Sequence, residues 1–143
     1  MIAAEGSADD PDSTEGQITV HNTDSNTNYK MVFHSGNTAY STAGIYCNAS
    51  TDSIYATHYY ETSDANYKTN IKAINNSNNI PEVREFDWKE DGSHSYGFIA
   101  QELEARGYDE LVSTDEVGKK TVNYSATLSL VVGKMQKKIE ELE

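Results

Sequence analysis

A hydroxyl, a carboxylate and an amine lie within six residues of one another near the middle of this chain, at Ser63, Asp64 and Lys68. These are the side-chain types with which a polypeptide can cut its own backbone, because an oxygen can attack a carbonyl carbon while an amine accepts a proton. The segment that holds them, residues 61–71, separates two stretches of different composition. We call residues 61–71 the seam.

A purely structural interpretation of the seam is also available. Serine is a preferred residue just before a helix, and an acidic residue in the first helical turn interacts favourably with the helix dipole. Taken alone, Ser63 and Asp64 would indicate a helix N-cap followed by an acid. The choice between the two interpretations depends on the rest of the chain.

Acidic side chains dominate the chain, with 23 Asp and Glu against 11 Lys and Arg and a formal net charge of −12. Residues 1–63 contain a single basic side chain, Lys30. A nucleic-acid site needs a basic patch that neutralises phosphates, so we expect no nucleic-acid partner. No apolar run approaches the roughly 18 residues of a membrane span, so we expect no membrane insertion. The histidines lack metal-ligand spacing, so we also expect no metal and no cofactor.

The stretch before the seam is polar and strand-forming. Residues 1–16 are small and acidic, and we predict a flexible lead-in there. Short strand-like runs follow, separated by Asn, Asp, Ser, Thr or Gly, at residues 18–21, 29–34, 44–47 and 53–56. A small sheet without a continuous apolar face is marginal in water. We therefore predict that residues 17–62 pair with copies of themselves in a fibre, with packing on the following domain as the alternative.

The stretch after the seam predicts a small mixed domain, which makes the fold class α+β. The expected elements are a short helix over 67–74, a strand over 83–88, a helix over 97–107 that ends at a glycine, and a hairpin of 111–113 and 120–123 around Gly118.

The last predicted helix, residues 124–143, has apolar residues in steps of 4, 3, 4 and 3, at Leu128, Val132, Met135, Ile139 and Leu142. This average of 3.5 is the repeat of a coiled-coil seam. An amphipathic helix lying on its own domain is the alternative. We predict association with sister chains.

Several motifs stand in a fixed order in residues 63–143: Ser63-Asp64 with Lys68, then Phe86-Asp87-Trp88, Gly97-Phe98-Ile99-Ala100-Gln101-Glu102, Leu111-Val112 and Val122-Asn123-Tyr124-Ser125. With the terminal heptad helix, this set resembles the intramolecular chaperone domain at the C-terminus of bacteriophage tail spikes and tail fibres, a family of self-cleaving Ser-Lys peptidases.

The resemblance implies a homotrimer in which residues 64–143 guide the folding of residues 17–63, the distal end of a tail fibre. It implies autoproteolysis of the serine type between Ser63 and Asp64, with Lys68 as the catalytic amine. Each chain would be cut once, with no turnover on other substrates. The fibre would assemble in the host cytoplasm and remain in the virion, and the chaperone part would be released.

A lysine amine is almost always charged at neutral pH, because its unperturbed pKa is about 10.4. A catalytic lysine must therefore lose hydration or lie near other cations before it can act as a base. Burial at a trimer interface would do this. We expect assembly to switch the reaction on and the isolated chain to be inactive.

The nucleophile stays open. Attack by the Ser63 hydroxyl on the carbonyl of its own residue would close a strained four-membered ring. The remaining routes are attack by Ser63 of a neighbouring chain, by a water that Lys68 activates, or by the Asp64 carboxylate through a six-membered ring.

Two further residues are candidates for a supporting role. Gln101 and Glu102 could orient the scissile region, for example by Glu102 holding Lys68, or could simply form a solvated helix face. An alternative function for the whole chain is a non-catalytic trimeric adhesin tip, whose Tyr-rich strands bind a host cell-surface saccharide.

Overall fold

The computed structural model describes residues 25–35 and 38–143. They belong to two compact units that divide between Asp64 and Ala65, and each unit is described by itself. The predicted lead-in, residues 1–16, and the predicted strand at 18–21 lie outside the described residues. The processing boundary expected after Ser63 stays a prediction.

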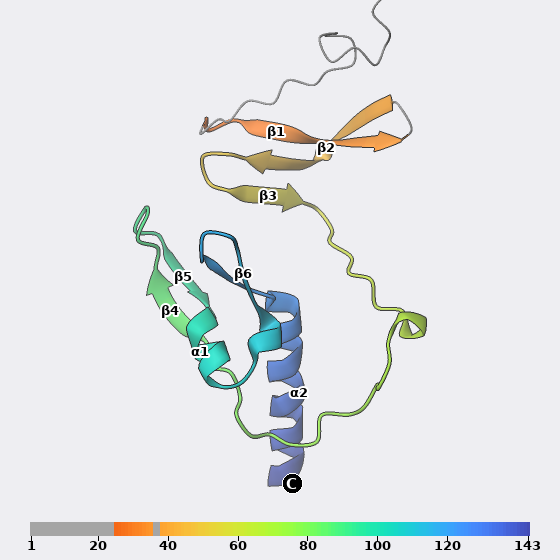
Figure 1. Cartoon of the computed structure of the whole chain (residues 1–143), viewed down its shortest axis with the longest axis vertical. Coiled ribbons are helices and arrows are strands. Elements are labelled where there is room, and N and C mark those ends of the chain that lie inside the picture. Colours follow the sequence, from red (N-terminus) through yellow and green to blue (C-terminus); the bar gives the residue numbers. More distant parts are fainter. Residues whose placement is uncertain (1–24, 36–37) are drawn as a thin grey trace, which may run out of the picture. The chain divides into compact units, whose positions relative to one another are not determined.

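The first unit is a three-stranded antiparallel sheet in the order β1-β2-β3 (Figure 1). Its strands are β1 (Asn28–Ser35), β2 (Thr38–Asn48) and β3 (Ser53–Ala56). The pairing of β1 with β2 shifts at a bulge between Lys30 and Val32. The predicted strands at 29–34 and 53–56 are confirmed, and the run at 44–47 is the end of a longer strand.

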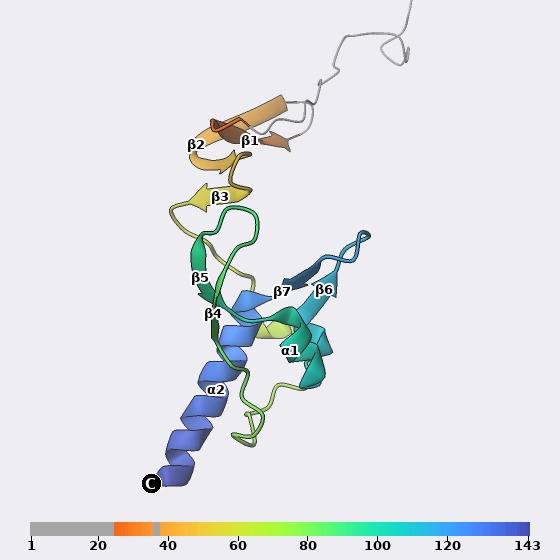
Figure 2. The same ribbon diagram turned by 90° about the vertical axis from the view of Figure 1, so that its left-hand side faces the viewer.

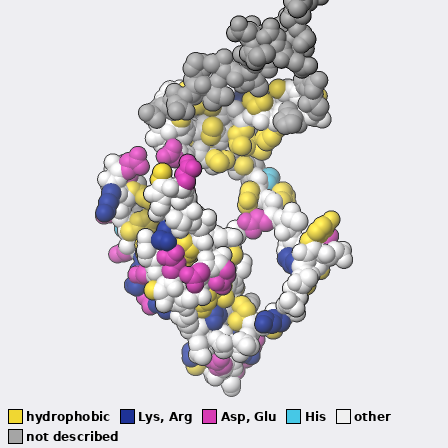
Figure 3. Space-filling view, in the orientation of Figure 1, with side chains coloured by type: hydrophobic (Ala, Val, Ile, Leu, Met, Phe, Trp, Pro, Cys, Tyr) yellow, Lys and Arg dark blue, Asp and Glu magenta, His cyan; other side chains and the backbone are white. Residues whose placement is uncertain are grey.

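Little of this sheet is buried within its own chain. In the described part of the unit, Asn48 alone is buried, and its side-chain amide donates hydrogen bonds to Asn26 and Asn28. Val32 and Ile54 are 63% and 72% exposed. Hydrophobic side chains gather on the face of the sheet that Figure 3 shows. The sheet therefore has polar ties between its strands but leaves its apolar side chains in solvent.

The second unit combines two short hairpins with helices (Figure 2). Its elements are a 3-10 turn η1 (Ala65–Tyr67), β4 (Arg84–Asp87), β5 (His94–Gly97), α1 (Ala100–Ala105), η2 (Asp109–Leu111), β6 (Val112–Thr114), β7 (Lys120–Val122) and α2 (Tyr124–Leu142). β4 pairs with β5 and β6 with β7, both antiparallel. Both hairpins lie at the end of α2 where that helix begins (Figures 1 and 2).

The hydrophobic core of this unit is small and is built from motif residues and their neighbours in sequence. Phe98, Leu103 and Leu111 are buried, and partly buried side chains pack around them, among them Val122 and Val131. Each Leu or Phe removed from water stabilises the fold by roughly 1.5–3 kcal/mol. The motif sequences that carry the family resemblance are therefore largely the scaffold of the fold.

Tyr124 joins two of these motifs. Its hydroxyl accepts a hydrogen bond of 3.2 Å from the backbone N–H of Phe98, and its ring lies 5.7 Å from that of Phe98. The next residue back, Asn123, caps α2 by accepting from the backbone N–H of Ala126 at 3.1 Å. A Cβ placed on Gly97 would overlap the Tyr124 hydroxyl, so this close approach requires glycine.

The turn and final-helix predictions are confirmed. Gly107 and Gly118 have φ of 81° and 86°, the left-handed region in which glycine ends α1 and closes the β6–β7 hairpin. α2 covers almost the whole of the predicted helix 124–143.

Two predicted helices are wrong in part or in whole. The helix expected over 67–74 is absent: only η1 forms, and Asn70 takes a φ of 54°, which a right-handed helix does not allow. The helix expected over 97–107 begins only at Ala100. Its first predicted residue instead ends strand β5, which the sequence did not indicate, because pairing with β4 and contact with Tyr124 hold it extended.

We predict that Gly97→Ala destabilises the chain by about 1–3 kcal/mol, because the added methyl overlaps a rigid aromatic side chain. Tyr124→Phe should cost about 1 kcal/mol, since it removes one partner of a partly buried hydrogen bond. Urea unfolding at one fixed chain concentration measures both.

The double variant provides the control. Because Tyr124→Phe removes the overlapping oxygen, the double variant should be less destabilised than the sum of the two single changes. Additive effects would contradict the proposed contact.

Candidate active site

The seam is exposed in the structure. Ser63, Asp64 and Lys68 all have exposed side chains. The only regular structure next to them is the three-residue turn η1, which the backbone N–H of Lys68 closes by donating to the carbonyl of Ala65 at 3.1 Å. No acidic residue lies in the first turn of η1. The alternative interpretation, a helix N-cap followed by a first-turn acid, is therefore wrong.

Exposure of Lys68 matters for the chemistry. A lysine works as a base near neutral pH when it is desolvated. The single chain does not supply that desolvation, since the residue is exposed. The backbone around the Ser63–Asp64 bond, by contrast, is accessible to an attacking group, because every residue from 57 to 75 is exposed.

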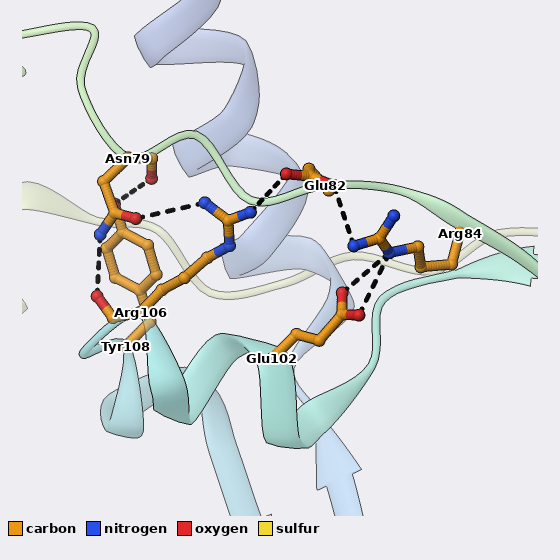
Figure 4. Close-up of polar contacts among 6 residues, drawn as sticks. All are labelled: Asn79, Glu82, Arg84, Glu102, Arg106 and Tyr108. Atoms are coloured by element: carbon orange, nitrogen blue, oxygen red, sulfur yellow. Dashed lines mark hydrogen bonds and ion pairs between the residues drawn. The ribbon is translucent and has the colours of Figure 1, made fainter.

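Glu102 has a definite partner. Its two carboxylate oxygens accept from Nε of Arg84 at 3.0 and 3.2 Å, so α1 is tied to the start of β4 (Figure 4). This hydrogen bond, together with the charges of Glu102 and Glu82, raises the pKa of the Arg84 guanidinium above its ordinary value. In the structure the role of Glu102 is thus to hold Arg84.

The ion pair extends into a network that fixes the chain ahead of β4. Glu82 pairs with both Arg84 and Arg106. Asn79 donates from its side-chain amide to the carbonyl of Arg106 at 2.8 Å, and its own carbonyl accepts from the Tyr108 hydroxyl at 2.6 Å (Figure 4). Residues 79–84 are therefore bound to the end of α1. No pattern in the sequence indicates this network, because isolated Glu and Arg residues are usually solvated.

Gln101 is exposed and lines a groove of about 540 Å³ between the two hairpins. Apolar and aromatic side chains form most of its wall, including Phe86, Trp88 and Tyr124. The rings of Phe86 and Trp88 meet edge to face with centroids 5.3 Å apart. The structure thus brings three of the quoted motifs to one groove and leaves the seam motif outside it.

The described residues contain neither a metal-binding cluster nor a helix suited to crossing a membrane. In residues 25–35 and 38–143, no group of three or more His, Cys, Asp or Glu side chains is arranged to hold a metal ion. None of the helices in that part of the chain has both the length and the apolar character needed to cross a bilayer.

Comparison with known proteins finds a family that part of the chain resembles. Residues 63–113 match a family of peptidases described as the chaperone of endosialidase. The predicted resemblance is confirmed. The match to the chaperone family begins at Ser63 in the seam, and it stops before β7 and α2. No curated protein and no solved structure gives a match.

The chaperone family carries a general functional implication. Its members are intramolecular chaperones with self-cleaving peptidase activity, associated with the trimeric tail proteins of phages. The match to residues 63–113 therefore supports a chaperone role and a capacity for self-cleavage at the level of the family.

We predict that Glu102→Gln leaves the pH dependence of self-cleavage unchanged, because Glu102 holds Arg84. The variant should lower the melting temperature only slightly, since the pair is exposed to solvent and screened. Cleavage followed by gel electrophoresis over a pH series measures the first effect, and thermal unfolding measures the second.

Glu104→Gln is the matched control, since Glu104 lies on the same helix and pairs with Lys120 at 2.7 Å. A displaced pH profile in Glu102→Gln, but not in this control, would show that Glu102 acts on the catalytic base.

Proposed function

We propose that residues 64–143 are the intramolecular chaperone of a phage tail fibre whose distal end is residues 17–63. Three chains associate through α2, the fibre strands pair in register, and each chain then cuts itself once between Ser63 and Asp64. The observation that carries this proposal is the exposed apolar repeat of α2.

The apolar repeat of α2 does not pack on its own unit. All five heptad residues are exposed, by 50–76%: Leu128, Val132, Met135, Ile139 and Leu142. A stripe of this length on a single chain leaves a large apolar area in water. Knobs-into-holes packing with the same stripe on other chains would remove that area from solvent.

A different face of α2 covers the unit. Thr127 and Lys134 are buried, and Leu130 and Val131 pack against the core. Because successive helical residues turn by about 100°, Thr127, Leu130 and Lys134 lie roughly a quarter turn or more from the centre of the heptad stripe. Val131 lies about 60° from that centre. Packing on its own domain therefore accounts for one face of α2 and leaves the heptad face available to sister chains.

The sheet of the first unit has a complementary need. Its apolar side chains are exposed in the single chain, and an isolated three-stranded sheet is marginal in water. Polar strands also slip in register at little cost. Three sheets held together by a trimeric clamp would cover one another, and the clamp would supply the alignment that the strands lack.

The cleavage is a hydrolysis. The Ser63–Asp64 amide bond breaks, the hydroxyl of water ends on the Ser63 carbonyl carbon, and the proton goes to the new amino group of Asp64. Lys68 accepts and returns the proton once the trimer interface desolvates it. Whether Ser63 of a neighbouring chain, water or Asp64 attacks first is decided by the variants below. After the cut, the fibre stays in the virion and the chaperone part leaves.

Receptor binding is a second candidate function, carried by the sheet. Tyr46 and Tyr55 are cross-strand neighbours whose rings stack with centroids 4.8 Å apart. They line an open hollow of about 410 Å³. Exposed aromatic rings suit the apolar faces of sugars, so we propose a host cell-surface saccharide as the ligand. Such a role can coexist with processing, and an uncut chain would leave it as the sole function.

We predict that the double change Val132→Glu and Ile139→Glu abolishes trimerisation and slows self-cleavage by at least about tenfold. Charges on the heptad face cannot be desolvated between chains, while the buried face of α2 is untouched. Sedimentation and gel electrophoresis at equal chain concentration measure the two effects.

Ser129→Glu with Gln136→Glu is the matched control, because both are exposed positions of α2 outside the heptad stripe. Cleavage of the monomeric variant at the rate of the unchanged chain would contradict the dependence on assembly.

We also predict different outcomes for the seam variants. Lys68→Met should stop cleavage by any route that needs the amine. Ser63→Ala should stop cleavage only if the neighbouring chain's hydroxyl attacks, and Asp64→Asn should stop it only if the carboxylate attacks. Fragment masses from mass spectrometry identify the bond that is cut, and a bond other than 63–64 would contradict the assignment.

A further inference from the structure

Lys134 is a buried lysine at the middle of α2. It is 7% exposed, and its amine donates to the backbone carbonyl of Asn78 at 2.7 Å and to the side-chain oxygen of Asn76 at 3.3 Å. Lysine is among the residues that are least often buried. Its two hydrogen bonds attach residues 76 and 78, which come shortly after the seam in sequence, to α2.

Two more contacts bind the same run to α2. The hydroxyl of Ser77, a buried residue, donates to the Glu141 carboxylate at 2.6 Å. The Ile74 side chain lies against Gly133 so closely that a Cβ on the glycine would overlap its Cδ1 atom. We call these contacts, of residues 74–78 with Gly133, Lys134 and Glu141, the clasp.

Two of the clasp residues on α2 are ones that are unfavourable at their positions, a glycine inside a helix and a buried lysine. Glycine inside a helix is disfavoured relative to alanine, and a buried amine loses hydration. Both residues lie at the contact with residues 74–78. Each is explained by the same feature, which is the close seating of this loop on α2.

The clasp lies near the seam along the chain. Ile74 comes six residues after Lys68 and ten after Asp64. Ten residues reach at most about 35 Å when fully extended, so anchoring Ile74 limits where the scissile bond can go. Because successive helical residues turn by about 100°, Gly133, Lys134 and Glu141 each lie about 120° to 140° from the centre of the heptad stripe. The clasp therefore leaves the heptad face clear for association.

We propose that Lys134 and Glu141 are positioning residues, which couple the association of α2 to cleavage by fixing the chain that follows the seam. The inference rests on the proposed function. When α2 associates with the same helix of the other chains, the clasp holds each seam at a fixed position along the helix bundle, close to the interface between chains. Without the clasp, the trimer still forms, but the seam is no longer delivered to its place.

Lys134→Met in the full chain tests this proposal. The methionine keeps the apolar stem and removes the donor to residues 76 and 78. We expect the trimer fraction to stay as in the unchanged chain, measured by sedimentation, and the cleavage rate per trimer to fall by about tenfold or more, because misplacement of reacting groups by about 1 Å costs up to about a hundredfold. Lys137→Met is the matched control, since Lys137 forms an exposed pair with Glu140 on the same helix.

A second arm separates positioning from assembly. A trimeric coiled coil appended after residue 143 enforces association of the variant chain. If Lys134 acts only by stabilising the trimer, the appended coil restores cleavage and the proposal is overturned. If Lys134 positions the seam, cleavage stays slow in the enforced trimer.

Two milder variants cover the case in which Lys134→Met does not fold. Ser77→Ala removes one clasp bond, and Gly133→Ala raises helix propensity while displacing Ile74. Both should slow cleavage per trimer, and the second should do so without lowering the helix content measured by circular dichroism. Unchanged cleavage in both would overturn the clasp as a positioning device. If the unchanged chain trimerises without any cleavage, or does neither, the proposed function itself fails, and that outcome is distinct.

Discussion

The structure of the second unit depends on one helix, α2, whose two faces have different surroundings. A 19-residue α2 presents one face to the small core and a different face, with an apolar residue every 3.5 positions on average, to solvent. The core that it covers consists of only a few buried side chains, so the unit draws much of its order from polar ties at the edges of the helix. The Tyr124 hydroxyl binds the end of β5 to the start of α2, and Lys134 binds residues 74–78 to the middle of the same helix.

The two units are stabilised by different interactions. The sheet of residues 28–56 lacks a buried hydrophobic residue among those described and relies on backbone pairing and an Asn48 hydrogen-bond cluster. The second unit has a core, yet it leaves the five heptad side chains of α2 exposed. Association of chains, as proposed above, would address both deficits, and the association of the matched family with trimeric phage tail proteins is consistent with it.

Regular patterns were readable from the sequence, and contacts between distant segments were not. Strong periodicity identified α2, and glycine at positive φ identified the turn of the β6–β7 hairpin. Two isoleucines three apart were too weak a signal for a helix, and the left-handed Asn70 removed it. Strand β5 has no apolar alternation and exists because β4 pairs with it. At the candidate site, residue types pointed to Ser63, Asp64 and Lys68, but the partners of Glu102 and Lys134 come from tertiary packing, which no local pattern encodes.

The open sheet also has a consequence for the time course of biogenesis. β1 and β3 are both edge strands, so a newly made chain offers two rows of backbone donors and acceptors to any other strand it meets. The second unit is built from hairpins and helices between near neighbours in sequence, and such local topology folds fast. It is also synthesised after the sheet. The chain is therefore most prone to aggregate after the sheet has been synthesised and before α2 is complete. Rapid folding of the second unit shortens this interval.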